Sequence, residues 1–482
     1  MPYRDFPQDG DRSIPLYLQI YRRFREAITL GRLHPGDRIP SVRGLAGEMH
    51  VARGTVEAAY QLLISEGYLL TRGPAGTVVS PQLPLRPVQN APVRHPAPPE
   101  SPLRPRPAVP PLPLQLGLPA LDAFPRKLWT RLAGNRLRRP GVENLVYPDP
   151  CGYAPLRSAI AAYLGISRGI LCGPEQVFIC AGYPAALGLI CRCLMTPGDH
   201  CWFEDPGYPF ARDVLTAAGA TLVPVPVDGM GLNVATARTL ADDARFALVT
   251  PSHQSPLGVA LSLPRRLALL EWANSRQSYI IEDDYDSEYR YQGRPLPALK
   301  SLDDGGRVLY AGTFSKVLYP GLRLAYLVVP AGLVARFAED CERLANHCPE
   351  LLQGTVSDFI EQGHFSRHLK KMRHLYALRR RYLEDAIQTI CPRYLRIEPQ
   401  AGGIQLLAWL KPGADDGALA DDALSSGLAV QALSRWRLAA NVEPGLLMGF
   451  TNIASPEQAE QICRTLLLSL SDSRPKQHPE CK

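Results

Sequence analysis

The chain has 482 residues, of which 46% are hydrophobic and 21% charged, so it is a globular protein with large cores and not an intrinsically disordered one. Its net charge of +7 is compatible with an anionic partner but does not by itself indicate one. The first residues, "MPYRDFPQDGDRS", are polar, so we expect no export signal and reduced cysteine thiols in the cytoplasm. The apolar runs are too short or too interrupted to predict a membrane span. The sequence contains no Cys-x-x-Cys pair, so cysteine spacing does not predict a metal site.

The segment 8–80 is predicted to hold three helices and then two short strands. In the first helix, apolar side chains recur at helical spacing, at Leu18, Tyr21, Ala27, Ile28 and Leu30. Ser41 is placed to cap a second helix, and a third runs from Thr55 to Ser65. The sequence "GYLLTRGPAGTVVS" predicts two strands joined by a Gly- and Pro-rich wing. Helix, turn, helix and wing form a DNA-reading arrangement whose second paired helix enters the major groove.

These residues resemble the winged-helix module of the GntR regulator family. The matching positions are Ile39-Pro40-Ser41-x-Arg43-x-Leu45-Ala46, Val51-Ala52-Arg53-x-Thr55-Val56, Ala59-Tyr60-x-x-Leu63 and Glu66-Gly67-Tyr68-Leu69. The resemblance implies that double-stranded DNA is contacted by Ser41, Arg43, Arg53, Thr55 and Arg72. Ala52 stands where the family usually has serine, which removes one expected phosphate contact. Arg53 could instead pair with Glu57, four residues further along the same helix.

Residues 81–113 are predicted to be a linker, because thirteen of these 33 positions are proline. Proline lacks an amide hydrogen and fixes φ, so the stretch cannot form a helix or an inner strand. An extended, polyproline-like tether is expected instead. It would separate the DNA-binding segment at 8–80 from a larger domain at 114–472.

The larger domain alternates short apolar runs with helical patterns. The candidate strands are "QVFICAG", "HCWFEDPG", "ATLVPVPV", "FALVTPS", "SYIIEDDYD" and "RVLYAGTFS". This alternation predicts an α/β fold with a mostly parallel sheet covered by helices. From about residue 330 long helical patterns take over, and "GGIQLLAWL" with "LLMGFTNI" predicts a smaller α+β subdomain.

The segment "GTFSKVLYPGLRLAY" holds the groups that an aldehyde cofactor with a phosphate requires. Lys316 offers an amine, Thr313 and Ser315 offer hydroxyls, and the Arg323 guanidinium can bind a phosphate through two hydrogen bonds. Pyridoxal 5′-phosphate also needs an acid beside its pyridine nitrogen and a flat group against its ring.

In their order along the chain, the candidates for these roles resemble the fold-type I, aspartate aminotransferase-like enzymes. The resemblance implies that Lys316 forms the Schiff base, Asp283 keeps the pyridine nitrogen protonated, and Tyr285 binds the ring hydroxyl. It also implies that Tyr208 stacks on the ring. The phosphate would be held by Thr313, Ser315, Arg323, the helix start at Gly182 and Tyr183, and Tyr147 reaching across a dimer. Ser255 replaces the family's asparagine in "TPSHQSPLG", so Gln254 or His253 would make the ring-hydroxyl contact, or it would be weaker.

The whole chain resembles the MocR subfamily of GntR regulators, in its vitamin-B6-responsive, PdxR-like branch. This implies a homodimer, head-to-tail and domain-swapped. Transaminases of this fold bind the substrate carboxylate through an arginine on a late strand, but here Leu447 takes that position. Arg435 or Arg437 could substitute for it.

Two functions follow from this resemblance. The favoured one is a transcriptional regulator that senses pyridoxal phosphate or an amino-acid-like effector and controls vitamin B6 or amino-acid metabolism genes. An active aminotransferase that carries a DNA-binding head is the alternative. A weaker third option is a regulator that binds an amino acid at the cofactor without completing transamination.

Overall fold

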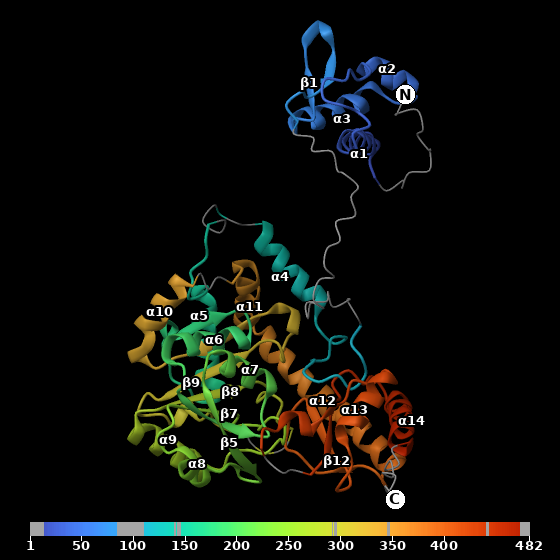
Figure 1. The fold of residues 1–482 in the computed structure, drawn as a ribbon. Coiled ribbons are helices and arrows are strands. Elements are labelled where there is room, and N and C mark those ends of the chain that lie inside the picture. The colour runs from blue at the N-terminus through green and yellow to red at the C-terminus, as the bar shows by residue number, and fades with distance from the viewer. Residues whose placement is uncertain are drawn as a thin grey trace, which may run out of the picture. The chain divides into compact units, whose positions relative to one another are not determined.

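The structure is a computed structural model that describes residues 14–83, 110–138, 141, 146–291, 293, 296–344, 348–439 and 443–472. Contacts between residues divide the chain into two units, Met1–Ala108 and Val109–Lys482. Each unit has its own hydrophobic core, and Figure 1 shows the helices and strands of both. Most of the proline-rich segment predicted at 81–113 lies outside the described residues.

The first unit contains three helices and a hairpin. Its elements are α1 (Leu16–Thr29), α2 (Val42–Glu48), α3 (Arg53–Ser65), β1 (Leu69–Thr71) and β2 (Thr77–Val79). The predicted winged helix is therefore confirmed, with β1 and β2 antiparallel. Two details differ from the prediction. The apolar stripe of α1 ends before Leu30, which is 58% exposed, and α3 begins two residues earlier than expected, at Arg53.

A single apolar core holds this unit together. It joins Phe24 and Ile28 of α1 to Leu45 of α2 and to Val56 and Leu63 of α3. These positions recur at helical spacing along each helix, so each helix turns one face inward. The opposite face of α3 is left for a partner.

The second unit is built on an eight-stranded mixed sheet. The order across it is β3 (Val177–Cys180), β10 (Ala325–Val328), β9 (Val308–Thr313), β8 (Tyr279–Asp284), β7 (Phe246–Val249), β4 (His200–Asp205), β5 (Thr221–Asp228) and β6 (Gly231–Leu232). All six predicted strands are present, and β9, β8, β7, β4 and β5 run parallel. The strands β10 and β6 were not predicted; both pair antiparallel with their neighbours.

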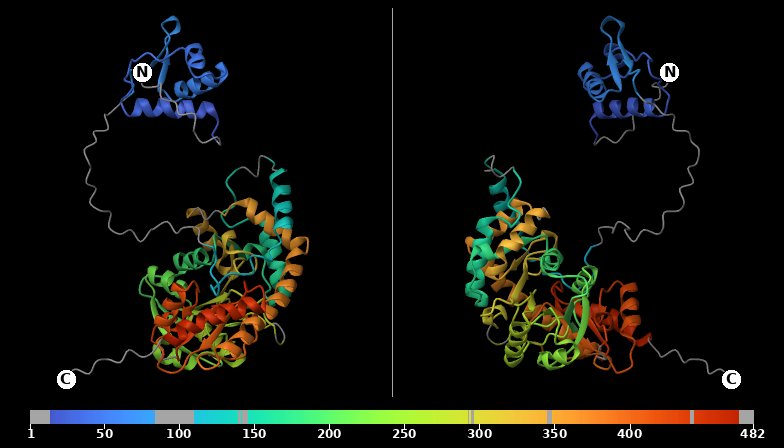
Figure 2. Two further views of the ribbon diagram at one scale, coloured as in Figure 1. Left: turned by 90° about the vertical axis from the view of Figure 1, so that its right-hand side faces the viewer. Right: turned by 60° about the vertical axis from the view of Figure 1, so that its left-hand side comes forward.

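Helices cover both faces of this sheet (Figures 1 and 2). Side chains alternate between the faces along a strand, so Phe203 of β4 packs into one core cluster and Trp202 into another. The first cluster includes α6 (Tyr183–Leu194), α7 (Pro209–Ala217) and α10 (Val334–Arg343). The second includes α8 (Val234–Ala241) and α9 (Leu263–Arg276). The carboxyl ends of the parallel strands are thereby left to form a site.

The remaining elements complete a smaller subdomain and its connections. The helices are α4 (Arg126–Arg138), α5 (Ala154–Arg168), α11 (Glu350–Glu361), α12 (His364–Ile390), α13 (Asp416–Ser425) and α14 (Pro456–Asp472). The antiparallel sheet has the order β11 (Arg396–Ile397), β12 (Gln405–Trp409), β14 (Gly445–Gly449) and β13 (Gln431–Ala432). This confirms the predicted α+β subdomain.

None of the helices within the described ranges has the length and apolar character needed to cross a bilayer. The ten cysteines of these ranges form no disulfide.

Candidate functional site

The DNA-reading candidates of the first unit lie on its surface. Arg53 is the first residue of α3 and is exposed, as are Arg43 of α2 and Arg72 beside the wing. Thr55, in the first turn of α3, is half-buried. In the described part of the chain no ion pair joins Arg53 to Glu57, so the Arg53 guanidinium remains available for a phosphate or a base edge.

The starts of the two paired helices differ in their capping. The hydroxyl oxygen of Ser41 accepts a hydrogen bond from the Gly44 amide at 3.0 Å, so Ser41 caps α2 and its hydroxyl hydrogen remains exposed. Ala52 precedes α3 and provides no side-chain cap. The absent serine therefore leaves the start of α3 without a side-chain cap.

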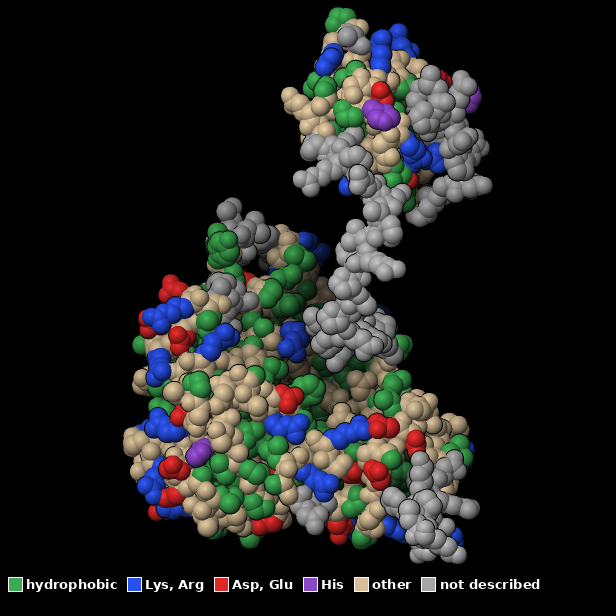
Figure 3. Space-filling view, in the orientation of Figure 1, with side chains coloured by type: hydrophobic (Ala, Val, Ile, Leu, Met, Phe, Trp, Pro, Cys, Tyr) green, Lys and Arg blue, Asp and Glu red, His purple; other side chains and the backbone are tan. Residues whose placement is uncertain are grey.

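Arg38 is a basic residue of this surface that sequence reasoning missed. Its backbone bridges to Val78 of β2, and a Cβ added at Gly76 would lie 3.2 Å from its Nε atom. The exposed Arg38 side chain therefore packs against the wing. Figure 3 shows basic side chains at the end of the unit that carries the hairpin. This pairing is tertiary, so no local sequence signal could have revealed it.

In the second unit a cavity of about 360 Å³ gathers most of the predicted cofactor residues. Eight of them line it: Tyr183, Tyr208, Asp283, Tyr285, Thr313, Ser315, Lys316 and Arg323. Seven of them come from the ends of β8 and β9, from the residues directly after these strands, or from the starts of α6 and α7, whereas Arg323 lies just before β10. The strand ends meet because parallel strands bring their carboxyl ends to one edge.

Lys316 supplies a buried amine to this cavity. Its Nζ atom donates a hydrogen bond to the Gly117 carbonyl oxygen at 2.9 Å. Burial lowers the pKa of the Lys316 amine, while the Asp286 and Asp283 carboxylates oppose that shift. A lowered pKa favours the neutral amine, the form that attacks an aldehyde.

Asp283 supplies a buried acid near the end of β8. Only 6% of it is exposed, and burial raises the pKa of Asp283 to about 8, although the Tyr183 hydroxyl beside it acts in the opposite direction. A carboxyl group in this state needs a cation to ionise at neutral pH. A protonated pyridine nitrogen is such a cation.

Two of the phosphate-binding candidates, Gly182 and Arg323, lie together at the start of α6. Gly182 has a φ of +89°, and a Cβ there would lie 2.9 Å from an Arg323 guanidinium nitrogen. Another residue at this position would be strained and would displace the guanidinium. The backbone contributes less than the sequence suggested, because Pro184 has no amide hydrogen and the Ala185 and Ala186 amides bond to the Gly182 carbonyl.

Gln254 does not reach the cavity, contrary to the expectation that it could bind the ring hydroxyl. It is completely buried, and its amide nitrogen donates to Glu204 and to the carbonyl oxygens of Pro206 and Ser255. Its side-chain oxygen accepts from the Leu257 amide. Both the nitrogen and the oxygen of the Gln254 side chain are therefore hydrogen-bonded to neighbouring protein groups. Gln254 orders the loop instead of binding a ligand.

Several lining residues gave no sequence signal. Trp436 and Gln431 come from the smaller subdomain, as does Gln405, and Phe210 comes from α7. The Trp436 ring lies 5.8 Å from that of Tyr208, so two aromatic rings meet in the lining of the cavity. Tyr147 is not part of this lining; it is 90% exposed.

A substrate-carboxylate arginine has no counterpart in this lining. Leu447 lies in the middle of β14, is fully buried, and packs in an apolar cluster with Leu407 and Leu433. Arg435 pairs with Asp421 at 2.7 Å, and neither it nor Arg437 lines the cavity. Among the described lining residues, Lys316 and Arg323 are the only cationic side chains.

These features fit pyridoxal 5′-phosphate. An amine with a lowered pKa, a buried acid that needs a cation, and a glycine beside an arginine are three of the groups that this cofactor requires, and Tyr208 offers the flat ring. Within the described residues no cluster of His, Cys, Asp and Glu is arranged to hold a metal.

Comparisons with known proteins agree with both units. Residues 16–79 match the bacterial regulatory proteins of the gntR family, and residues 130–444 match aminotransferase class I and II. The chain is 37% identical to the probable rhizopine catabolism regulatory protein MocR of Rhizobium meliloti, over 96% of each chain. It is 32% identical to the HTH-type pyridoxine biosynthesis transcriptional regulator PdxR of Corynebacterium glutamicum, again over 96% of each.

The solved structures that it resembles are aminotransferases. One is LysN, the α-aminoadipate aminotransferase of Thermus thermophilus, complexed with N-(5′-phosphopyridoxyl)-L-leucine. It is 28% identical with a TM-score of 0.68, covering 75% of this chain and 92% of that one. The chain therefore belongs to the MocR-type transcriptional regulators, in which a GntR-family winged helix precedes an aminotransferase-like domain.

Proposed function

We propose that this regulator binds promoter DNA through its first unit and holds pyridoxal 5′-phosphate in the cavity of the second. The second unit would then sense the cofactor itself, or an amino-acid-like molecule that meets it there. The observation that carries this proposal is the composition of the cavity. It offers an amine, a buried acid and a phosphate-binding arginine, while the position of a substrate-binding arginine is taken by Leu447.

Each residue of the cavity would have a separate role in binding the cofactor. Lys316 would provide the amine for the aldehyde, and Asp283 would hold a proton on the pyridine nitrogen. Tyr208 would lie against the ring. The phosphate would be bound by Thr313, Ser315, Arg323, Tyr183 and the Gly182 cradle. When bound, the cofactor supplies an electron-withdrawing ring.

We further propose a head-to-tail, domain-swapped homodimer in the bacterial cytoplasm. In such a dimer, Tyr147 of one subunit would reach the phosphate site of its partner, and its 90% exposure is consistent with that role. A ligand that binds the two dimer conformations unequally would change the spacing of the DNA-binding units. We also propose target genes in vitamin B6 or amino-acid metabolism; the name of the pyridoxine biosynthesis regulator PdxR supports the first of these.

An active aminotransferase that carries a DNA-binding head is the second candidate. The resemblance of the second unit to aminotransferases favours it. Against it, an apolar leucine cannot make the two parallel hydrogen bonds that orient a carboxylate, and losing them costs about 2–4 kcal/mol.

Turnover separates these two candidates. Purified protein is mixed with pyridoxal phosphate and then with a panel of amino acids and a keto acid. The regulator proposal predicts no sustained product formation, whereas steady transamination of any amino acid would establish the enzyme.

A further inference from the structure

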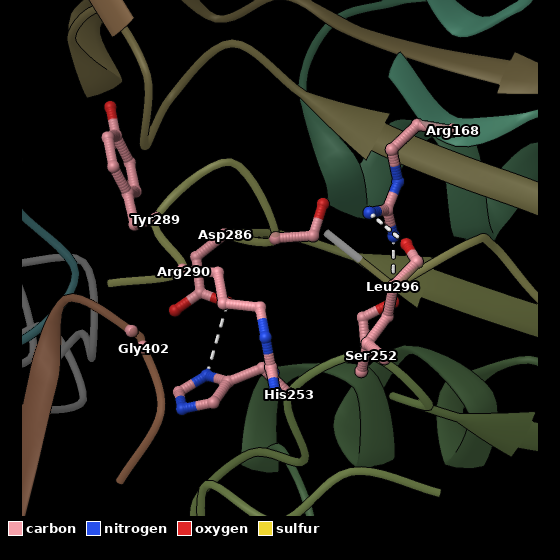
Figure 4. A pocket seen from close by; sticks show the side chains of 10 residues that line it. Arg168, Ser252, His253, Asp286, Tyr289, Arg290, Leu296 and Gly402 are labelled. Carbon is pink, nitrogen blue, oxygen red and sulfur yellow. Dashed lines mark hydrogen bonds and ion pairs between the residues drawn. The ribbon is translucent and has the colours of Figure 1, made fainter. Parts of the chain in front are cut away.

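A second and much smaller cavity adjoins the loops that follow β7 and β8. Its volume is about 20 Å³, and it is lined by residues that include Ser252, His253, Asp286, Ser287 and Arg290 (Figure 4). The dashed lines there mark the contacts of Arg168 with Ser252 and Leu296 and of His253 with Asp286. Polar side chains contribute to this lining although they are buried.

Several buried polar atoms of this lining have no partner in the described part of the chain. They are His253 Nε2, Asp286 Oδ2, Ser287 Oγ, Arg290 Nε and Arg168 Nε. His253 is 8% exposed and Asp286 only 1%, so bulk water does not satisfy them. A buried water needs about 10–15 Å³ of space and two to four polar partners. A cavity of this volume has room for one water.

The geometry around His253 fixes the position of its proton. Its Nδ1 atom lies 3.2 Å from Asp286 Oδ1 and 3.0 Å from the Tyr285 hydroxyl oxygen. A carboxylate can only accept hydrogen bonds, so the proton belongs on Nδ1. Since that N–H points between Asp286 and Tyr285, the Tyr285 hydroxyl must turn its own hydrogen elsewhere. Tyr285 also lines the larger cavity.

We propose that His253 and Asp286 are positioning residues that hold the Tyr285 hydroxyl as a hydrogen-bond donor into the larger cavity. This rests on the proposed function, since the acceptor is the ring oxygen of pyridoxal phosphate. Gly403 makes the arrangement possible: its φ is +94°, and a Cβ there would overlap the His253 ring.

A donor to the ring oxygen stabilises its deprotonated form. Loss of that donor therefore raises the pH midpoint at which the near-visible absorbance of the bound cofactor changes, by roughly one unit for one hydrogen bond. Other charged or titratable groups lie near Tyr285 and His253, namely Glu204, Asp283, Asp286, Tyr289, Arg168 and Arg290. A double-mutant cycle cancels their contribution, because they are present in every variant of the cycle.

The experiment is the pH titration of this absorbance in full-length protein. Tyr285→Phe removes the donor and should raise the midpoint by roughly one unit. His253→Phe should raise it in the same direction, because Tyr285 is then no longer held. The double variant should have the same pH midpoint as Tyr285→Phe alone, because His253 acts only through Tyr285. Asp286→Asn, taken through the same cycle, provides a second test if His253→Phe does not fold.

An unchanged midpoint in His253→Phe, or a shift that persists in the Tyr285→Phe background, would overturn the positioning role while leaving the proposed function intact. Absence of any near-visible band in the wild type would instead overturn the proposed function and this inference with it.

Discussion

The amine of Lys316 is tied to the backbone carbonyl oxygen of Gly117 by a hydrogen bond of 2.9 Å, although 199 positions separate the two residues. Gly117 has a φ of +77°, a conformation that glycine adopts readily and other residues rarely do. The segment before α4 therefore closes the cavity over the amine that the cofactor needs.

Gly117→Ala should lower the free energy of unfolding by about 1–3 kcal/mol, because an alanine held at positive φ is strained. A Cβ there would lie 2.6 Å from Lys316 Nζ, so the amine would also have to shift. Chemical denaturation of the cofactor-free protein measures the stability. Gly188→Ala in α6 is the matched control, since a Cβ there meets nothing within 4 Å. Equal stability in both variants would show that glycine is not required at position 117.

Lys316→Ala should abolish the near-visible absorbance that wild-type protein gains with pyridoxal phosphate, because no other lysine lines the cavity among the described residues. Spectra of dialysed protein measure this directly. Lys370→Ala, an exposed position of α12, should keep the band. A band retained by Lys316→Ala would assign the amine to another residue.

Asp283→Asn should alter the pH dependence of stability. The raised pKa, about 8 against an ordinary 3.8, gives stability that is complete below pH 4 and is lost as the pH rises to 8, since the unfolded chain releases its proton first. The neutral asparagine avoids this loss. Cofactor-free Asp283→Asn should therefore melt a few degrees above the wild type at pH 8, and the difference should shrink at pH 5.

The affinity of Asp283→Asn for the cofactor should be lower than that of the wild type, because asparagine cannot neutralise a protonated pyridine nitrogen. Asp385→Asn, exposed on α12, controls for the loss of a negative charge. Parallel pH profiles in wild type and Asp283→Asn would mean that Asp283 is not the buried acid described above.

Arg53→Ala should weaken DNA binding and leave the cofactor spectrum unchanged. If Arg53 contacts a phosphate, the slope of log affinity against log salt should fall by about one. Arg32→Ala, an exposed arginine that pairs with Glu26 at 3.2 Å, is the control. Gel shifts at several salt concentrations measure the DNA affinity and its dependence on salt. Unchanged affinity in Arg53→Ala would mean that α3 does not face the DNA as proposed.

The sequence revealed the parts of the site that depend on local order. Lys316 and Asp283 follow from strand ends, because parallel strands deliver their last residues to one edge of the sheet. Two contacts join segments that are far apart in the chain: Arg38 with the wing, and Trp436 with Tyr208. Periodicity and motif spacing describe only local sequence, so they do not predict these contacts. Gln254 was misjudged because its orientation depends on buried carbonyl groups that only the folded loop presents.

The central claim is that one chain couples the cavity around Lys316 to DNA. The most direct test is the affinity of the full-length protein for a site selected from random DNA, measured with and without saturating pyridoxal phosphate. Wild type should change its affinity at least fivefold, about 1 kcal/mol of coupling, and Lys316→Ala should not change. An unchanged affinity in the wild type, or an equal change in Lys316→Ala, would contradict the claim.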